Sequence, residues 1–319
     1  MATLDYWFDY SCPYAYLGST QVTALAGRTG AHLRWQPMLL GGVFKATGNH
    51  SPAEIPAKEK WMQQDLQRWA ARYGAAFKRN PHFPINTLTL MRGAVGMQMR
   101  GMDFAKYAET IFHAMWAEPC NLGDPQELAA VLRRAGFDAD AFQSLVGDPA
   151  VKEQLKKDTE EAVARGVFKA TGNHSPAEIP AKEKWMQQDL QRWAARYGAA
   201  FKRNPNFPIN TMTLMRGAAG MQMRGSDFPK YVETIFHAMW AEPRNLGDPQ
   251  ELAAVLRQAG FDADAFQSLV SDPAVKEQLK RNTEEAVARG VFGAPTFFVG
   301  EEMFWGQDRL EFVAAALAR

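Results

Sequence analysis

The sequence contains most of itself twice. Residues 42–165 recur at an offset of 124 as residues 166–289, and the two copies differ at eleven positions. A unit of this length is too long for a solenoid repeat, in which units of roughly 20–45 residues stack on one another. Removing one 124-residue copy from the 319 residues leaves 195, an ordinary size for one domain with an insertion. We therefore interpret the chain as a parent protein of that length with a tandem duplication.

Each copy is predicted to be all-α. Apolar and aromatic residues recur at helical spacing over 56–73, and Gly74 follows as a residue type that often ends a helix. Asp124 followed by Pro125 combines a capping side chain with a proline in the first turn, which is typical of a helix start. A further helix is expected over 104–116.

The two unduplicated ends of the chain carry strand patterns. Short runs rich in aromatic and apolar residues occur here beside amphipathic segments. The predicted strands are 4–8, 33–37, 296–299 and 301–305, and the predicted helices are 13–28 and 308–318. A β-α-β half and a β-β-α half separated by helices indicate one α/β domain that an insertion interrupts.

The predicted fold class is thus α/β, with an all-α insertion in two near-identical tandem copies. The predicted segments are 1–42 (first half), 43–166 and 167–272 (the two helical copies) and 273–319 (second half, α-β-β-α). Helix 276–290 leads directly into the second half, so we expect it to pack against the sheet, and its near twin over 152–166 competes for the same place. The copy whose helix does not pack on the sheet must cover its apolar face elsewhere. We therefore predict a homo-oligomer or two helical copies packed on each other.

Composition and charge exclude several classes of protein. With 36 basic and 35 acidic residues, the chain lacks the field that attracts nucleic acid or an anionic membrane, and neither is an expected partner. It opens with no basic segment before an apolar stretch and has no run of 18 apolar residues, so we expect a cytoplasmic protein. Its six histidines and two cysteines match no metal-ligand spacing, and no metal is expected.

Cys12 is the candidate nucleophile. It follows strand 4–8 and opens helix 13–28, where free backbone N–H groups and the helix dipole favour a thiolate. Ala15 stands where a resolving cysteine three residues on would be, so unaided dithiol–disulfide cycling is excluded. The alternative is an inert cysteine buried in the turn, because free cysteines are commonly buried.

Five separated blocks give the chain a family resemblance. They are Cys12 to Leu17, Gly41 to Asn49, Phe83 to Thr87, Gly290 to Pro295 and Phe304 to Leu310. The helix-start Cys-Pro and the late Ala-Pro-Thr before a strand resemble the thioredoxin superfamily, and the inserted helices resemble its DsbA-like branch. In their order, the five blocks resemble 2-hydroxychromene-2-carboxylate isomerases and kappa-class glutathione transferases. The resemblance covers the whole 195-residue parent and implies a thioredoxin-like domain.

The resemblance also implies a binding site for glutathione. Asp308 resembles the partner of the glutathione ammonium group, and Gln307 lies beside it at a helix start, which suits a carboxylate. Ala294 precedes Pro295, whose peptide bond is expected to be cis, and would offer its backbone to the cysteinyl part of glutathione. Asp308 has an alternative role as a helix cap only, since Asp is a favoured cap.

Asn49 and Lys58 resemble family positions that reach the glycyl end of glutathione and the rim of the site. Their alternatives are a turn residue and a solvated charge, respectively. The second copy supplies Asn173 and Lys182 at the equivalent positions, without a second thiol. Because the first copy directly follows the second strand, as in the parent, we expect Asn49 and Lys58 to serve the site.

Cys12 departs from the family pattern. The related isomerases and transferases carry serine at this position, and in this chain Ser11 precedes the cysteine. A Cys12 thiol donates a weak hydrogen bond to the glutathione thiolate, whereas a Cys12 thiolate would repel it and favour a mixed disulfide. Both Cys12 and Ser11 are therefore candidate catalytic residues.

Three functions are compatible with these residues. The first is a glutathione-dependent isomerase or transferase acting on a small aromatic electrophile. The second is a single-cysteine thiol–disulfide oxidoreductase coupled to glutathione. The third is a non-catalytic binding or structural protein in which the extra copy covers the cleft. Arg92 and Arg216, which follow the two Phe-Pro-Ile-Asn-Thr blocks, face either the active-site cleft or the surface.

Overall fold

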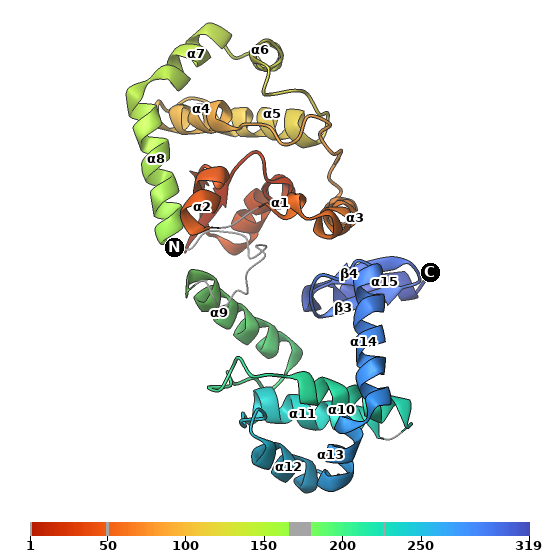
Figure 1. Cartoon of the computed structure of the whole chain (residues 1–319). Helices are drawn as coiled ribbons and strands as arrows, with labels where there is room; N and C mark the ends of the chain where they lie inside the picture. Colours follow the sequence, from red (N-terminus) through yellow and green to blue (C-terminus); the bar gives the residue numbers. More distant parts are fainter. Residues whose placement is uncertain (1, 49–50, 166–179, 226) are drawn as a thin grey trace. The chain divides into compact units, whose positions relative to one another are not determined.

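The chain divides into two compact units. The computed structural model describes residues 2–48, 51–165, 180–225 and 227–319 (Figure 1). One unit comprises Met1–Lys182 and Gly293–Arg319, and the other comprises Glu183–Phe292. The first unit therefore joins both chain ends to the first helical copy, and the second unit holds most of the second copy.

Both predicted pairs of strands form in the first unit. β1 (Thr3–Phe8) and β2 (His32–Pro37) are parallel, and α1 (Pro13–Thr29) connects them. β3 (Thr296–Val299) and β4 (Glu302–Trp305) are antiparallel. The last helix is α15 (Leu310–Leu317), after a 3-10 turn over Gln307–Arg309. The predicted β-α-β and β-β-α halves are thus confirmed, and among the described residues they form two separate two-stranded sheets.

Six helices of the first copy, α3 to α8, have counterparts in the described part of the second. In the first copy they are α2 (Leu40–Thr47), α3 (Pro56–Tyr73), α4 (Leu88–Met99), α5 (Phe104–Trp116), α6 (Pro125–Arg134), α7 (Ala139–Gly147) and α8 (Pro149–Ala164), with a 3-10 turn over Pro52–Glu54. In the second they are α9 (Pro180–Tyr197), α10 (Met212–Met223), α11 (Phe228–Phe236), α12 (Pro249–Gln258), α13 (Ala263–Ser271) and α14 (Pro273–Ala288), with a π-helical turn over His237–Ala241. The helices predicted over 56–73 and 104–116 have those bounds. No helix in the described part of the chain is long and apolar enough to cross a membrane.

Local sequence determines where these helices begin and how closely they pack. The Asp124 side chain accepts hydrogen bonds from the first N–H groups of α6, as the cap pattern predicts. Gly93 allows α4 to lie close to α5 and α7, because a Cβ at this position would be 2.2 Å from Tyr107 Oη and 2.6 Å from Phe142. Gly217 has the same role in the second copy, where a Cβ would be 2.3 Å from Tyr231 Oη. Each copy therefore builds its helical core in the same way.

The first copy packs against the β-α-β half through α8. The backbone N–H of Leu39, at the end of β2, donates to Thr159 Oγ1 on α8 at 3.0 Å. Met38, Val43 and Ala162 form a small buried cluster between these elements. From the sequence we expected the second-copy helix over 276–290 to pack on the sheet, but α8 of the first copy packs against β2. The physical reason is that β2 runs directly into α2, which leads into the first copy.

The C-terminal half packs against α3 of the first copy. Arg68 forms an ion pair with Glu302 at 2.8 Å, and the rings of Trp61 and Trp305 meet edge to face with centroids 5.4 Å apart. Trp61 is 7% exposed, whereas the equivalent Trp185 on α9 is 47% exposed. The first copy therefore closes both halves of the α/β domain.

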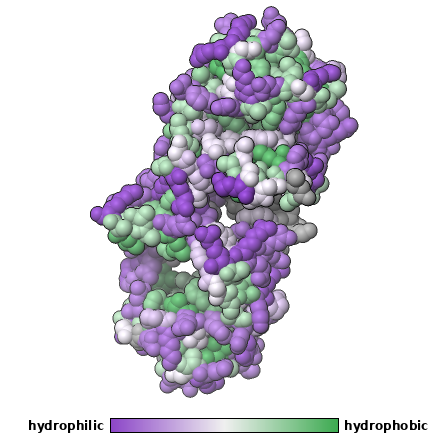
Figure 2. Space-filling view, turned by 180° about the vertical axis from the view of Figure 1, so that it is seen from behind, coloured by the Kyte–Doolittle hydropathy of each residue, from purple (hydrophilic) through white to green (hydrophobic). Residues whose placement is uncertain are grey.

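Apolar side chains also remain at the surface. Figure 2 shows one face on which apolar patches interrupt a mainly hydrophilic surface. The large exposed apolar residues of the second unit include Trp185, Tyr197, Met212, Met215, Met223, Phe236 and Val287. The predicted homo-oligomer or copy-on-copy packing would cover such a surface and stays a prediction.

Candidate active site

Cys12 lies at the N-terminus of α1. It occupies the N-cap position in an extended conformation, and Pro13 is the first helical residue. The Cys12 backbone N–H donates to Asp9 O at 3.0 Å, which closes the turn between β1 and α1. The thiol is free and half-buried, so the alternative of a fully buried, inert cysteine does not describe it. The free N–H groups of the first helical turn make this a place that stabilises negative charge.

The buried carboxylate of Asp9 holds the turn in place. Asp9 is 1% exposed and accepts hydrogen bonds from both N–H and Oγ of Ser11, from Leu40 N–H and from Thr87 Oγ1, at 2.8–3.0 Å. Burial raises the pKa of Asp9, and these four hydrogen bonds oppose that rise. The side chain therefore ties together the Cys12 turn, the start of α2 and the start of α4.

Ser11 uses its hydroxyl within the turn. Its Oγ donates to Asp9 Oδ1 at 3.0 Å, and its backbone N–H donates to the same atom at 2.9 Å. This geometry makes Ser11 a positioning residue for the Cys12 turn. Its predicted catalytic role stays a proposal.

A buried polar chain connects α1 to the C-terminal half. The Tyr14 hydroxyl, two residues after Cys12, donates to Asp65 Oδ2 at 2.9 Å, and Arg309 donates to both Asp65 oxygens at 2.7 and 3.0 Å. The guanidinium lies between the rings of Trp61 and Trp69, 5.7 and 5.4 Å from their centroids. Burial disfavours the charged guanidinium, but the hydrogen bonds and charge of Asp65 outweigh it and hold the pKa of Arg309 above its usual value.

The side chains of Tyr14, Asp65 and Arg309 link the predicted site residue Asp308 to the first turn of α1. Asp308 forms an ion pair with Arg309, and both belong to the 3-10 turn after β4. The N-cap of that turn is Gly306, whose φ of 105° and contact with the Asp308 carboxylate exclude a side chain. Asp308 is therefore not a helix cap, and its carboxylate is half-buried beside a cation.

The Ala294–Pro295 peptide bond is cis, as expected. Both residues are exposed at the start of β3, and the Gly306 N–H donates to Pro295 O at 3.0 Å. This hydrogen bond holds the cis-proline turn beside the turn that carries Gln307 and Asp308. These C-terminal candidates therefore form one group.

Lys58 lies in the first turn of α3 and is half-buried. Burial lowers its pKa, so the Lys58 ammonium is not the fully solvated charge of the alternative interpretation. Asn49 lies outside the described residues, as does Asn173. The side chain of Lys182 is likewise outside the described part of the chain.

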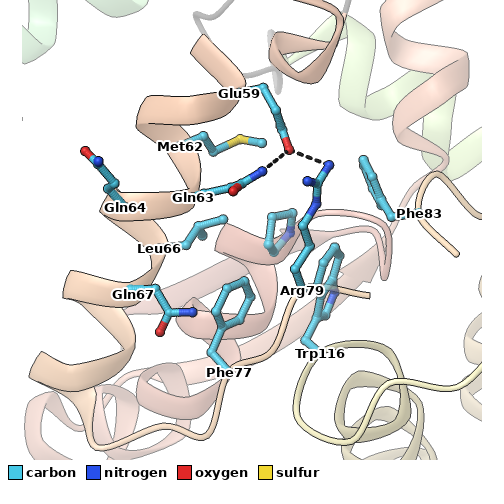
Figure 3. Close-up of a pocket in the computed structure, with 11 residues that line it drawn as sticks. Glu59, Met62, Gln63, Gln64, Leu66, Gln67, Phe77, Arg79, Phe83 and Trp116 are labelled. Atoms are coloured by element: carbon cyan, nitrogen blue, oxygen red, sulfur yellow. Dashed lines mark hydrogen bonds and ion pairs between the residues drawn. The ribbon is translucent and has the colours of Figure 1, made fainter. Parts of the chain in front are cut away.

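An aromatic-lined cavity begins beside Cys12, at Pro13. Its volume is about 260 Å³, and its lining comes from α1, α3, the segment after α3 and the end of α5. Figure 3 shows α3 side chains on one wall and the rings of Phe77, Phe83 and Trp116 on the other. The Phe77 and Trp116 rings are stacked with centroids 6.0 Å apart. The cavity therefore presents aromatic rings to a flat apolar group, and Pro13 in its lining is the residue that follows the candidate nucleophile in sequence.

One ion pair lies at this cavity. Arg79 and Glu59 approach to 2.5 Å, and Gln63 Nε2 donates to the same Glu59 oxygen at 2.9 Å (Figure 3). These groups, with Gln64 and Gln67, are the polar part of the lining. Among the described residues, no group of three or more His, Cys, Asp or Glu side chains is placed to hold a metal ion.

Sequence reasoning missed the buried chain of Tyr14, Asp65 and Arg309. A signal was present on α3, where Asp65 stands at helical spacing between Trp61 and Trp69 on the face that packs inward. An acidic residue on such a face requires a buried partner. Its partner lies 244 residues further along the chain, beyond the reach of local patterns.

Comparisons with known proteins find relatives of the chain. 2-Hydroxychromene-2-carboxylate isomerase of Sphingobium xenophagum is 35% identical over 151 residues, which cover 46% of this chain and 75% of that protein. Glutathione S-transferase kappa 1 of Homo sapiens is 27% identical over 180 residues, covering 52% of this chain and 77% of that protein. A solved structure of 2-hydroxychromene-2-carboxylate isomerase, at 23% identity, covers 61% of this chain and 96% of that chain with a TM-score of 0.46.

A family model places the chain more broadly. The model described as DSBA-like thioredoxin domain matches residues 3–168 and matches again over residues 168–318. The double match follows the repeated sequence, since each part contains one helical copy. The chain thus belongs to the DSBA-like thioredoxin domain family, with 2-hydroxychromene-2-carboxylate isomerases and kappa glutathione S-transferases as its homologues.

Proposed function

We propose that the chain is a glutathione-dependent isomerase or transferase acting on an aromatic electrophile. The observation that carries this proposal is a half-exposed thiol at a helix N-terminus, followed directly by an aromatic-lined cavity. The relatives named as isomerases and transferases support the same reaction class. We place the protein in the cytoplasm, and we interpret the second copy as an insertion that leaves this site in the first unit.

The first unit carries charges that fit glutathione, which has two carboxylates and one ammonium group. Asp308 offers a half-buried carboxylate to the ammonium group, and Lys58 offers a half-buried ammonium to a carboxylate. The exposed backbone of Ala294 is available to the peptide part of the ligand. When bound, glutathione would supply a thiolate that adds to an activated double bond.

The chain itself would supply charge stabilisation and orientation. The N-terminal N–H groups of α1 stabilise a thiolate, and the Cys12 thiol donates a weak hydrogen bond to it. The aromatic rings of the cavity hold a flat substrate and exclude water from the reacting atoms. Arg79 offers guanidinium N–H groups to an acidic substituent of the substrate.

A second candidate is a single-cysteine thiol–disulfide oxidoreductase. The observation that favours it is the cysteine itself, a free and half-buried thiol at a helix N-terminus, because a cysteine sulfur is the nucleophile that attacks disulfides. In this reaction the Cys12 thiolate would attack the substrate disulfide, form a mixed disulfide and release one substrate thiol; glutathione would then attack the substrate sulfur, which releases Cys12 and leaves a disulfide between glutathione and the substrate.

The Cys12→Ser variant separates the two candidates. If the first is correct, isomerase or transferase activity with glutathione is retained or rises, because serine is the residue of the related enzymes. If the second is correct, disulfide reduction is lost in Cys12→Ser and retained in Cys120→Ser, the matched control at the other cysteine.

Calorimetric titration of the intact chain with reduced glutathione tests whether the site binds at all. The expected result is one glutathione per chain, with weaker binding in Asp308→Asn. Absence of binding in calorimetry and in a second method would refute both proposals and leave the non-catalytic role.

A further inference from the structure

A second cavity lies in the first unit between α2, α4 and α8. Its volume is about 530 Å³, which is within the range of small-molecule sites. It is lined by Leu39, Gly42, Ala46, Leu88, Arg92, Lys152, Leu155, Lys156, Thr159, Glu160 and Val163. Among the described residues, neither Cys12 nor the glutathione-site candidates line it, whereas Arg92, for which the sequence left the cleft or the surface open, does.

The cavity carries excess positive charge. Three cations, Arg92, Lys152 and Lys156, face a single carboxylate, Glu160, which is 4.0 Å from Lys156. In the part of the chain that the structure describes, no carboxylate pairs with Arg92 or Lys152, and the buried Nε of Arg92 has no hydrogen-bond partner. A buried N–H group without a partner is costly, and an anionic oxygen would remove that cost.

The remaining wall is apolar. Leu39 and Ala46 come from the β2–α2 segment, Leu88 from α4, and Leu155 and Val163 from α8. These side chains form a surface on which an apolar group loses water favourably. The cavity therefore combines a cationic part with an apolar part.

The same arrangement occurs in the second copy. A cavity of about 570 Å³ there includes Arg216, Lys276, Lys280 and Glu284, the equivalents of Arg92, Lys152, Lys156 and Glu160. Leu279 and Thr283 also recur at the positions of Leu155 and Thr159. The counterpart of the α2 wall falls among residues 166–179, which the structure does not describe. The two units thus build the cationic part of the cavity from equivalent residues.

We propose that the cavity between α2, α4 and α8 binds an organic anion with an apolar body and one acidic group. The acidic group would accept hydrogen bonds from Arg92 and lie near Lys152, and the body would lie on the leucine side chains. The cavity connects to the Cys12 turn through Asp9, which accepts from Leu40 and Thr87, the neighbours of the lining residues Leu39 and Leu88.

Two fluorescent probes with the same aromatic body test this proposal. 8-Anilinonaphthalene-1-sulfonate carries one negative charge, and N-phenyl-1-naphthylamine carries none. We expect the intact chain to bind the anionic probe more tightly than the neutral one. Because a hydrogen bond to a charged group contributes about 1.5–3 kcal/mol, Arg92→Gln should weaken binding of the anionic probe by about tenfold or more. Binding of the neutral probe should change by less than about twofold.

The duplication supplies the matched control. Arg216→Gln makes the same substitution in the second copy and should reduce binding of the anionic probe less than Arg92→Gln, because Leu39 of the apolar wall lies before the repeated segment and has no counterpart there. Equal effects of the two variants, or unchanged binding in Arg92→Gln, would overturn the proposal. So would a parallel loss of the neutral probe, because it would indicate a damaged fold. Arg92→Gln should still bind glutathione, which separates this site from the proposed active site.

Discussion

The buried ion pair between Asp65 and Arg309 predicts a specific mode of failure. The Asp65 side chain has no exposed surface, and that of Arg309 is 11% exposed. Asp65→Asn retains the shape of the side chain but removes the charge that compensates the guanidinium. Loss of one partner of a buried pair typically costs about 3–5 kcal/mol. This cost should fall on the docking of the C-terminal half onto α3, because Arg309 belongs to that half.

Hydrogen exchange of residues 302–317 measures this docking directly. A loss of about 3–5 kcal/mol corresponds to exchange that is roughly 100- to 4000-fold faster in Asp65→Asn, if local opening controls exchange. Glutathione affinity should fall in the same variant, since Asp308 is on the released segment.

Asp189→Asn is the matched control for this experiment. Asp189 stands at the equivalent position of α9, whose sequence is identical to that of α3, but Arg309 bonds to Asp65. We therefore expect residues 302–317 to stay protected in Asp189→Asn. Equal exchange in the two variants, or protection in Asp65→Asn as strong as in the unchanged chain, would show that this reasoning is wrong.

Three further predictions concern the rest of the fold. Asp9→Asn should lower unfolding free energy by about 1–3 kcal/mol, because an amide NH₂ would replace an acceptor of Leu40 or Thr87; urea denaturation monitored by fluorescence checks this. Gly93→Ala and Gly217→Ala should each cost about 1–3 kcal/mol or more, in the first and second unit respectively, because each added Cβ meets a tyrosine; hydrogen exchange resolved by residue should place each loss in its own unit. Hydrogen bonds from the Ala141 and Asp140 N–H groups lower the pKa of Asp138. The stability that this cap contributes is therefore present above about pH 4 and is lost as pH falls through the lowered pKa. The difference in denaturation midpoint between Asp138→Asn and the unchanged chain should shrink in acid, and a constant difference would contradict the prediction.

Local sequence patterns were sufficient for much of the fold. The helix over 56–73, the start of α1 at Pro13 and the strand before Gly300 follow from residue spacing, caps and turn residues. The cis bond before Pro295 came from family resemblance, because few X–Pro bonds are cis and composition alone does not identify one.

Long-range pairings were beyond such patterns. The two copies have nearly the same sequence, so no local signal states which α3-type helix receives the C-terminal half. In the structure Asp65 of the first copy also accepts from Tyr14 on α1, a residue outside the repeated segment that local patterns do not connect to α3. The bracing of the Cys12 turn by Thr87 likewise joins residues 78 positions apart.

Helices α3 and α9 share one 18-residue sequence but have different surroundings. Trp61 is sheltered against the C-terminal half, and Trp185 is largely open to solvent. The protein therefore contains an internal control. The intrinsic helix propensity of α3 and α9 is the same, so a difference between them in opening rate or in tryptophan emission measures the effect of their tertiary contacts. A substitution that removes the Asp65 charge removes the partner of Arg309, whereas the same change at Asp189 leaves that pair in place, so we expect α9 to tolerate more substitutions than α3. We expect future divergence between the copies to accumulate first on α9.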